Sequence, residues 1–238
     1  MTVAPGVPGF RIRVPPSWFQ FDAWRAGRTS DLARLVDARI THQPQLRRYR
    51  GAILGLLREF AEDAQRRGAL LCAVTADPVA DAGNVLASLM VFRTDGSADP
   101  RENTVEGIAA GITAHEGAEG TGSWRRVQVV DLPAGRAVRV SGVDVVRDGP
   151  AELDAVVMHT LWAAPGGGVF DVVLTSPQTQ LADAMLDLFD AISGTFTWAE
   201  GEPGRHQPDQ GDVAPDPDAP AESAIGGVPR PVGPVERS

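Results

Sequence analysis

The sequence predicts an α+β protein: an antiparallel β-sheet of about six to seven strands covered by helices, as in an α/β/α sandwich. Four runs with a period-two apolar pattern follow one another between residues 125 and 174. The turns that join these runs are too short for a crossover, so neighbouring strands must be antiparallel. Segments with a 3.6-residue apolar period precede and follow the four runs and supply the helices.

The N-terminal part is predicted to contain one strand and two helices. Residues 10–14 alternate apolar and charged side chains, and two prolines end this strand. The aromatic residues of segment 17–24 are expected to pin a turn to the core. A capped helix follows at 29–40, and a longer one runs from Pro44 to about residue 67, so that residues 29–67 form a helical insertion. One apolar stripe of the long helix is made of Leu46, Tyr49, Ile53, Leu56, Leu57, Phe60 and Ala64.

The remaining elements are predicted in order along the chain. Two adjacent strands at 69–75 and 85–92 are followed by a helical pattern within 99–117. The antiparallel meander then has strands at 125–132, 136–143, 155–163 and 169–174. The last strand leads through Ser176 and Pro177, as N-cap and first helical residue, into an amphipathic helix, and Gly194 stands at its expected left-handed C-cap. The apolar stripe of this helix is Leu181, Met185, Leu188, Phe189 and Ile192.

Composition divides the chain into one folded domain, residues 1–198, and a tail, residues 199–238. The tail holds eight of the nineteen prolines and no aromatic residue, and its net charge is −5 out of −9 for the whole chain. Such a segment cannot bury enough apolar surface to offset the entropy of ordering, so we predict that it is disordered. The mildly acidic body argues against a nucleic-acid partner.

The N-terminus lacks the pattern of a secretory signal, and no segment is apolar enough to span a membrane. Cys72 is the only cysteine and lies in an apolar run, which indicates a buried, inert thiol. The simplest location is the cytoplasm, with export without a cleaved leader left open.

The order of elements resembles the PsbP-like family of α/β/α sandwiches over about residues 10–198. The resemblance is carried by the segment from Val14 through Pro15-Pro16-Ser17 to Trp18, and by the closing strand, Ser-Pro turn and helix that ends near Phe196. The predicted helical insertion is longer than in that family. The resemblance implies a binding or assembly factor with no shared catalytic residue.

Motifs of catalysis and cofactor binding are not found in the sequence. His115 has no second histidine at zinc-motif spacing, no serine stands in a nucleophile elbow, and the glycine run at 166–168 is not a phosphate-binding loop. We therefore expect no catalytic residue, no metal and no cofactor. Two alternatives stay open: an enzyme with a dispersed site, for example Arg139, Asp144 and His159, and a binder of a small ligand.

The strongest local charge is basic. Residues 25–58 contain eight arginines against two aspartates, a local charge of +6. Arg47, Arg48 and Arg50 lie at the predicted start of the long helix, where cations are unfavourable. We therefore predict that they bind an acidic protein partner or the acidic tail. The alternative is an ordinary solvated helix face in an arginine-biased sequence. The function predicted from sequence is a non-catalytic protein-interaction or assembly module of unknown pathway and oligomeric state.

Overall fold

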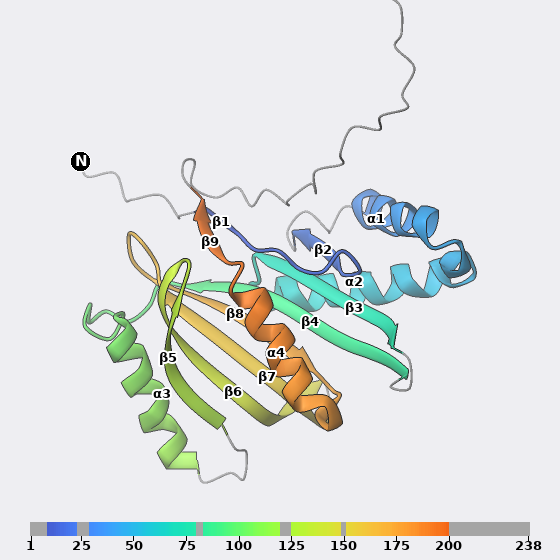
Figure 1. Cartoon of the computed structure of the whole chain (residues 1–238). Coiled ribbons are helices and arrows are strands. Elements are labelled where there is room, and N and C mark those ends of the chain that lie inside the picture. Colours follow the sequence, from blue (N-terminus) through green and yellow to red (C-terminus); the bar gives the residue numbers. More distant parts are fainter. Residues whose placement is uncertain (1–8, 23–28, 80–82, 120–124, 149–150, 200–238) are drawn as a thin grey trace, which may run out of the picture.

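The computed structural model describes residues 9–22, 29–79, 83–119, 125–148 and 151–199 (Figure 1). The helices are α1 (Thr29–His42), α2 (Arg50–Arg66), α3 (Val105–Glu119) and α4 (Ala182–Ser193), with short 3₁₀ helices η1 (Pro44–Tyr49) and η2 (Thr179–Leu181). The strands are β1 (Gly9–Arg11), β2 (Phe19–Asp22), β3 (Leu71–Val79), β4 (Gly83–Thr94), β5 (Arg125–Leu132), β6 (Gly135–Asp148), β7 (Ala151–Ala163), β8 (Val169–Ser176) and β9 (Thr197–Ala199).

Seven strands form one antiparallel sheet in the order β2-β3-β4-β8-β7-β6-β5. The predicted α+β class and the meander of β5 to β8 are confirmed. Strands β1 and β9 pair separately, also antiparallel. In this order β2 and β5 are the two edge strands of the sheet.

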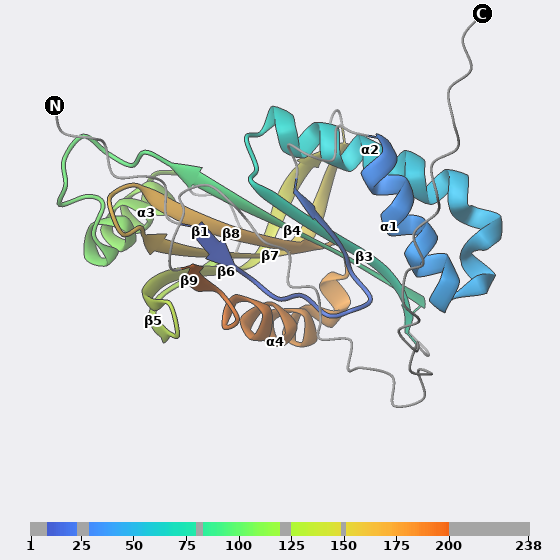
Figure 2. The same ribbon diagram turned by 90° about the horizontal axis from the view of Figure 1, so that it is seen from above.

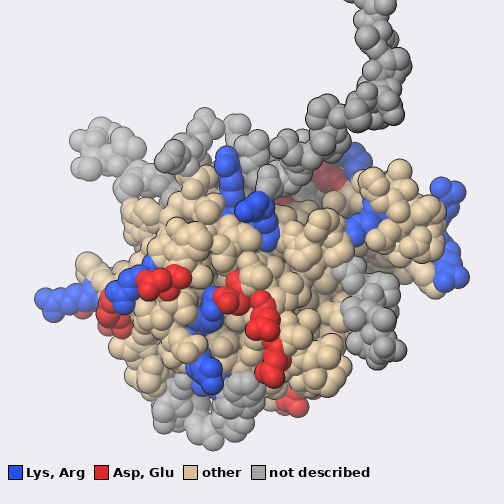
Figure 3. Space-filling model, in the orientation of Figure 1, with Lys and Arg blue, Asp and Glu red and all other residues tan. Residues whose placement is uncertain are grey.

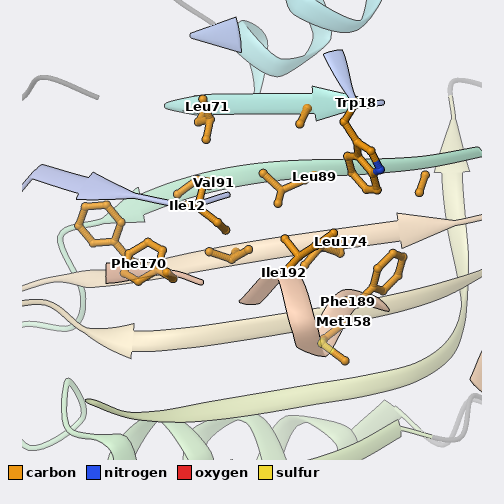
Figure 4. Packing of buried hydrophobic residues seen from close by; sticks show 14 of the residues in the cluster. Ile12, Trp18, Leu71, Leu89, Val91, Met158, Phe170, Leu174, Phe189 and Ile192 are labelled. Carbon is orange, nitrogen blue, oxygen red and sulfur yellow. The ribbon is translucent and has the colours of Figure 1, made fainter. Parts of the chain in front are cut away.

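The face of the sheet that packs against α4 contains the main core (Figure 4). In β8, Phe170, Val172 and Leu174 are fully buried, and the residues between them are not, as expected when alternate side chains point to opposite faces. The predicted apolar stripe of α4 adds Met185, Phe189 and Ile192 to this core.

The opposite face is covered at its two ends. At one end, α1 and α2 pack on β2, β3 and β4, with Cys72 and Met90 among the buried contacts. At the other end, α3 lies near β5 and β6. Figure 2 shows α2 and α4 on opposite sides of the sheet. Between the two groups of helices, Val157, His159 and Val173 of the central strands stay half-exposed.

Several local predictions need correction. The aromatic segment contains the edge strand β2 rather than only a turn, and the first strand ends at Arg11 and pairs with β9. The long helix is divided because the chain after Pro44 makes a 3₁₀ turn, which is frequent at helix N-termini. The last helix begins later than predicted, because Ser176 Oγ contacts Gln178 in a turn before η2. Gly194 has φ −63°, so the C-cap is not left-handed.

The predicted boundary between domain and tail stays a prediction. The last described strand, β9, ends at Ala199, the first residue of the predicted tail, and residues 200–238 lie outside the described residues.

Candidate functional sites

Of the three arginines predicted to bind a partner, Arg50 is engaged inside the α1–α2 hairpin. Its Nε and Nη2 donate to the two carboxylate oxygens of Asp37 on α1, at 2.6 and 2.8 Å. This bidentate hydrogen bond lowers the pKa of Asp37 and raises the pKa of Arg50. Arg50 therefore joins the two helices and holds η1 at the end of the hairpin.

Arg47 and Arg48 lie in η1 and are exposed. The guanidinium of Arg48 stands 4.6 Å from the centre of the Tyr49 ring, within the range of a cation–π contact. Figure 3 shows basic side chains at the end of the molecule formed by the turn between α1 and α2. The structure thus places two of the three predicted binding residues together on an accessible surface.

Two apolar side chains expected in the core extend this surface. Tyr49 is 48% exposed and Leu56 is 66% exposed, because α2 buries Leu54, Leu57, Ala61 and Ala64 instead. Tyr49 ends η1 at the N-cap of α2, and Leu56 lies about two helical turns further along α2. We call Arg47, Arg48, Tyr49 and Leu56 the hairpin surface.

Of the other arginines of the predicted basic region, Arg58 is exposed on α2, and the rest have local roles or lie outside the described residues. Arg39 donates to the carbonyl oxygens of Pro16 and Trp18 and lies over the Phe19 ring, which fastens α1 to the segment around β2. Arg34 pairs with Asp31 in the first turns of α1. Arg25 and Arg28 are not described. The basic surface is therefore smaller than the local charge of the sequence suggests.

A second group of polar side chains lies on the half-exposed part of the sheet. His159 on β7 contacts Asp171 on β8, with 2.9 Å between Nδ1 and Oδ2. This contact orients the imidazole and leaves Nε2 for another partner. The second oxygen of Asp171, Oδ1, is buried and has no hydrogen-bond partner in the described part of the chain. Beyond Val173, the hydroxyls of Ser88 and Thr175 are 2.6 Å apart on the same face.

A small hollow lies beside His159, over Gly142 of β6. Gly142 pairs with Val157 on one side and Arg125 on the other, and it has no side chain to fill the space between them. The hollow has a volume of about 10 Å³, which is room for one water-sized group. Arg125 and Asp144, which form an ion pair, stand at its rim with His159. A glycine inside a strand often marks a close approach of another group.

The dispersed set considered from the sequence does not converge. Asp144 and His159 both line this hollow, but Arg139 points to the other face, where it pairs with Asp190 of α4 at 2.5 Å. Arg139 is an odd-numbered residue of β6, whereas Gly142 and Asp144 are even-numbered, and alternation sends them to opposite faces. Arg125, and not Arg139, is the arginine that lies near Asp144 and His159. Only the register of β5 against β6 reveals this position of Arg125.

Cys72 is buried under α2, and desolvation raises the pKa of its thiol to about 12. This environment agrees with the predicted inert thiol. No three His, Cys, Asp or Glu side chains are placed to share a metal ion in the part of the chain that the structure describes. Within those same residues, no helix has both the length and the apolar character to cross a membrane.

The fold and the two surfaces define an α+β protein with a helical hairpin at one end of its sheet. No protein-family model matches the sequence, and no curated protein matches it. The PsbP-like resemblance therefore stays a prediction.

Two of several solved structures with a distant likeness to this chain are LpqN and CalU16. LpqN, involved in cell envelope biogenesis of Mycobacterium tuberculosis, matches at 12% identity and TM-score 0.41, covering 82% of this chain and 86% of LpqN. CalU16, from Micromonospora echinospora, matches at 13% identity and TM-score 0.22, covering 51% of this chain and 82% of CalU16.

Proposed function

We propose that this chain is a non-catalytic protein-interaction module that binds an acidic partner through the hairpin surface. The observation that carries the proposal is the exposure of Tyr49 and Leu56 beside Arg47 and Arg48. Tyrosine and arginine are the residue types enriched at the energetic centres of protein interfaces. An acidic partner fits because Arg47 and Arg48 place two exposed positive charges next to Tyr49.

The ion pair between Arg50 and Asp37 also supports binding through Arg47 and Arg48. Asp37 pairs with Arg50, and within the described α1–α2 hairpin no ion pair joins an acidic side chain to Arg47 or Arg48. The Arg50–Asp37 contact joins the two helices before binding, which lowers the cost of ordering the hairpin end when a partner binds. Electrostatic attraction would mainly raise the association rate and would weaken with salt.

The proposal can be tested with a photo-cross-linking amino acid at position 56, introduced into the full chain in cells of its native host. A matched control carries the same amino acid at Asp187, an exposed position on α4. We expect a discrete cross-linked product from position 56 only, and loss of that product when Arg47→Ser and Arg48→Ser are added. Equal products from both positions, or no product from position 56, would contradict the proposal.

The mass of the product separates the two predicted binders. A cross-link to another protein increases the mass by that protein, whereas a cross-link to the acidic tail leaves one chain whose digest joins residue 56 to a peptide from residues 199–238. An acidic partner protein and the acidic tail were both predicted from charge, and this readout distinguishes them. The cytoplasmic location is not needed for either result and stays a prediction.

A second candidate function is binding or turnover of a small polar ligand that contacts the rim of the hollow over Gly142 and places one water-sized group inside it. It is favoured by one observation: His159, oriented by Asp171, stands at the rim together with the Arg125–Asp144 pair. Native mass spectrometry of the purified full chain would reveal a retained ligand mass. Gly142→Ala fills the hollow and should remove that mass, whereas Gly111→Ala on α3 should not. A spectrum without any added mass would count against this candidate.

A further inference from the structure

We propose that two copies of this chain associate through strand β5, edge to edge, so that the two sheets continue into one another beneath the two α3 helices. This surface is separate from the hairpin surface, and the proposal does not depend on the function assigned there.

Strand β5 is an edge that can accept another strand. It pairs with β6 alone among the described strands, and over its eight residues it contains no proline. The outer backbone N–H and C=O groups of an edge strand are a template for a further strand. The other edge, β2, is only four residues long and lies next to α1, so it offers a much shorter template.

A groove runs between α3 and the outer part of β5, which lie beside one another in Figure 1. It measures about 520 Å³ and is lined by Ala109, Ala110, Thr113 and Ala114 of α3 and by Val127 and Val129 of β5. No side chain from Val105 to Ala114 is buried, although this part of α3 is largely apolar. Helix α3 thus leaves an apolar face uncovered next to an unpaired strand edge.

The charge pattern of β5 is complementary to itself. Arg125 and Arg126 stand at its start and Asp131 near its end, with valines between them. In an antiparallel pair formed by a two-fold axis perpendicular to the sheet, facing residues must point to the same face of the sheet. Centring the axis on Gln128 meets this requirement. It places Arg125 opposite Asp131 of the second copy twice, and Val127 opposite Val129 twice.

In this register the second copy would also fill the groove between α3 and β5. Val127 and Val129 lie on the face toward α3, so the same residues of the second copy would enter the space beside the small side chains of α3. Opposite charges and β-branched pairs that face one another each stabilise an antiparallel ladder. A second copy of β5 therefore pairs the backbone edge, fills the apolar groove and gives Arg125, which already pairs with Asp144 of its own chain, a second acidic neighbour.

Sedimentation velocity of the full chain over a range of concentrations tests the association. We expect a species of twice the 25.2 kDa chain mass. Val129→Lys puts two cations near the axis and should weaken the dimer by about tenfold or more, which is a change of roughly 1.4 kcal/mol. Val145→Lys is the matched control, because Val145 is 51% exposed against 44% for Val129 but lies on β6 beyond the end of β5.

Disulfide trapping tests the register and does not depend on the stability of the lysine variant. Gln128→Cys should form a covalent dimer on mild oxidation, because directly opposed residues of an antiparallel pair have a Cα separation that a disulfide can bridge. Gln180→Cys, at another exposed glutamine, should remain a monomer under the same oxidation. Cys72 is fully buried and does not compete. A chain that sediments as a monomer at all concentrations, or a dimer that Val129→Lys leaves unchanged and Gln128→Cys does not trap, would overturn the proposal.

Discussion

Replacing Phe196 by alanine should be among the most destabilising single changes in this protein. Phe196 is fully buried between the end of α4 and the sheet. Its ring stacks on Trp162 of β7 with 4.4 Å between centres, and it lies 5.6 Å from Phe10 and 5.1 Å from Trp198. It therefore joins the main sheet to both strands of the small β1–β9 sheet.

The magnitude follows from the removed volume and the lost ring contacts. Buried Phe→Ala changes cost about 3–5 kcal/mol, and each well-placed aromatic pair adds roughly 0.5–1.5 kcal/mol beyond its buried area. We expect a loss of about 4–5 kcal/mol, a large part of the roughly 5–15 kcal/mol that stabilises a typical domain. With a urea m-value of about 2 kcal/mol per molar, the midpoint of unfolding falls by about 2 M.

Equilibrium unfolding in urea, followed by tryptophan fluorescence and by far-UV circular dichroism, measures this effect. Leu56→Ala is the comparison, because that side chain is exposed and its removal should change the free energy of unfolding by no more than about 0.5 kcal/mol. A loss below about 1 kcal/mol for Phe196→Ala would refute the reasoning, since it would mean that the aromatic cluster contributes little to the global stability.

Three further predictions concern other parts of the fold. Gly107→Ala in α3 should lower the melting temperature because its Cβ would meet the carbonyl oxygen of Arg101, whereas Gly111→Ala, with open space around it, should stabilise the helix by up to about 1 kcal/mol. Cys72 should react with a thiol reagent only on unfolding. Because its pKa in the folded protein is raised from 9.0 to about 12, the contribution of the thiol to stability is present below pH 9.0 and is lost as the pH rises toward about 12. The urea midpoints of the wild type and of Cys72→Ala, compared across this pH range, measure the loss. Asp37 has a lowered folded pKa, so its contribution is present above its ordinary pKa of 3.8 and is lost as the pH falls through the lower folded value; Asp37→Asn should remove this part of the acid dependence measured by thermal unfolding.

The elements that the sequence predicts correctly are those whose pattern is complete within the segment. The meander of β5 to β8 follows from period-two runs and short turns, and α4 follows from a stripe in which Met185, Phe189 and Ile192 are buried as expected. In α4 and in strands β6 to β8 the local period and the tertiary environment agree, because these segments pack against the main core, whereas β5 keeps the period although none of its residues is buried.

The sites are less predictable because they depend on register and on which element lies above. The sequence stripe of α2 could not separate Leu57, which is buried, from Leu56, which is exposed, since both are leucines one residue apart. Arg125 could not be grouped with His159 without the pairing of β5, β6 and β7. The Arg50–Asp37 pair likewise depends on how the chain turns between α1 and α2, where η1 replaces the predicted first turns of the long helix.

The two faces of the sheet differ in a way that bears on function. The α4 face is closed by large apolar side chains, and its buried hydroxyls Thr160 and Ser193 contact one another. The opposite face is covered only at its ends, and its centre carries the His159–Asp171 contact and the unfilled position of Gly142. A glycine and an oriented histidine on a central strand forgo apolar packing that valine or isoleucine would supply. Stability alone does not favour these residues there, so the central strands of this face are where the effect of substitution on binding and its effect on folding should separate most clearly.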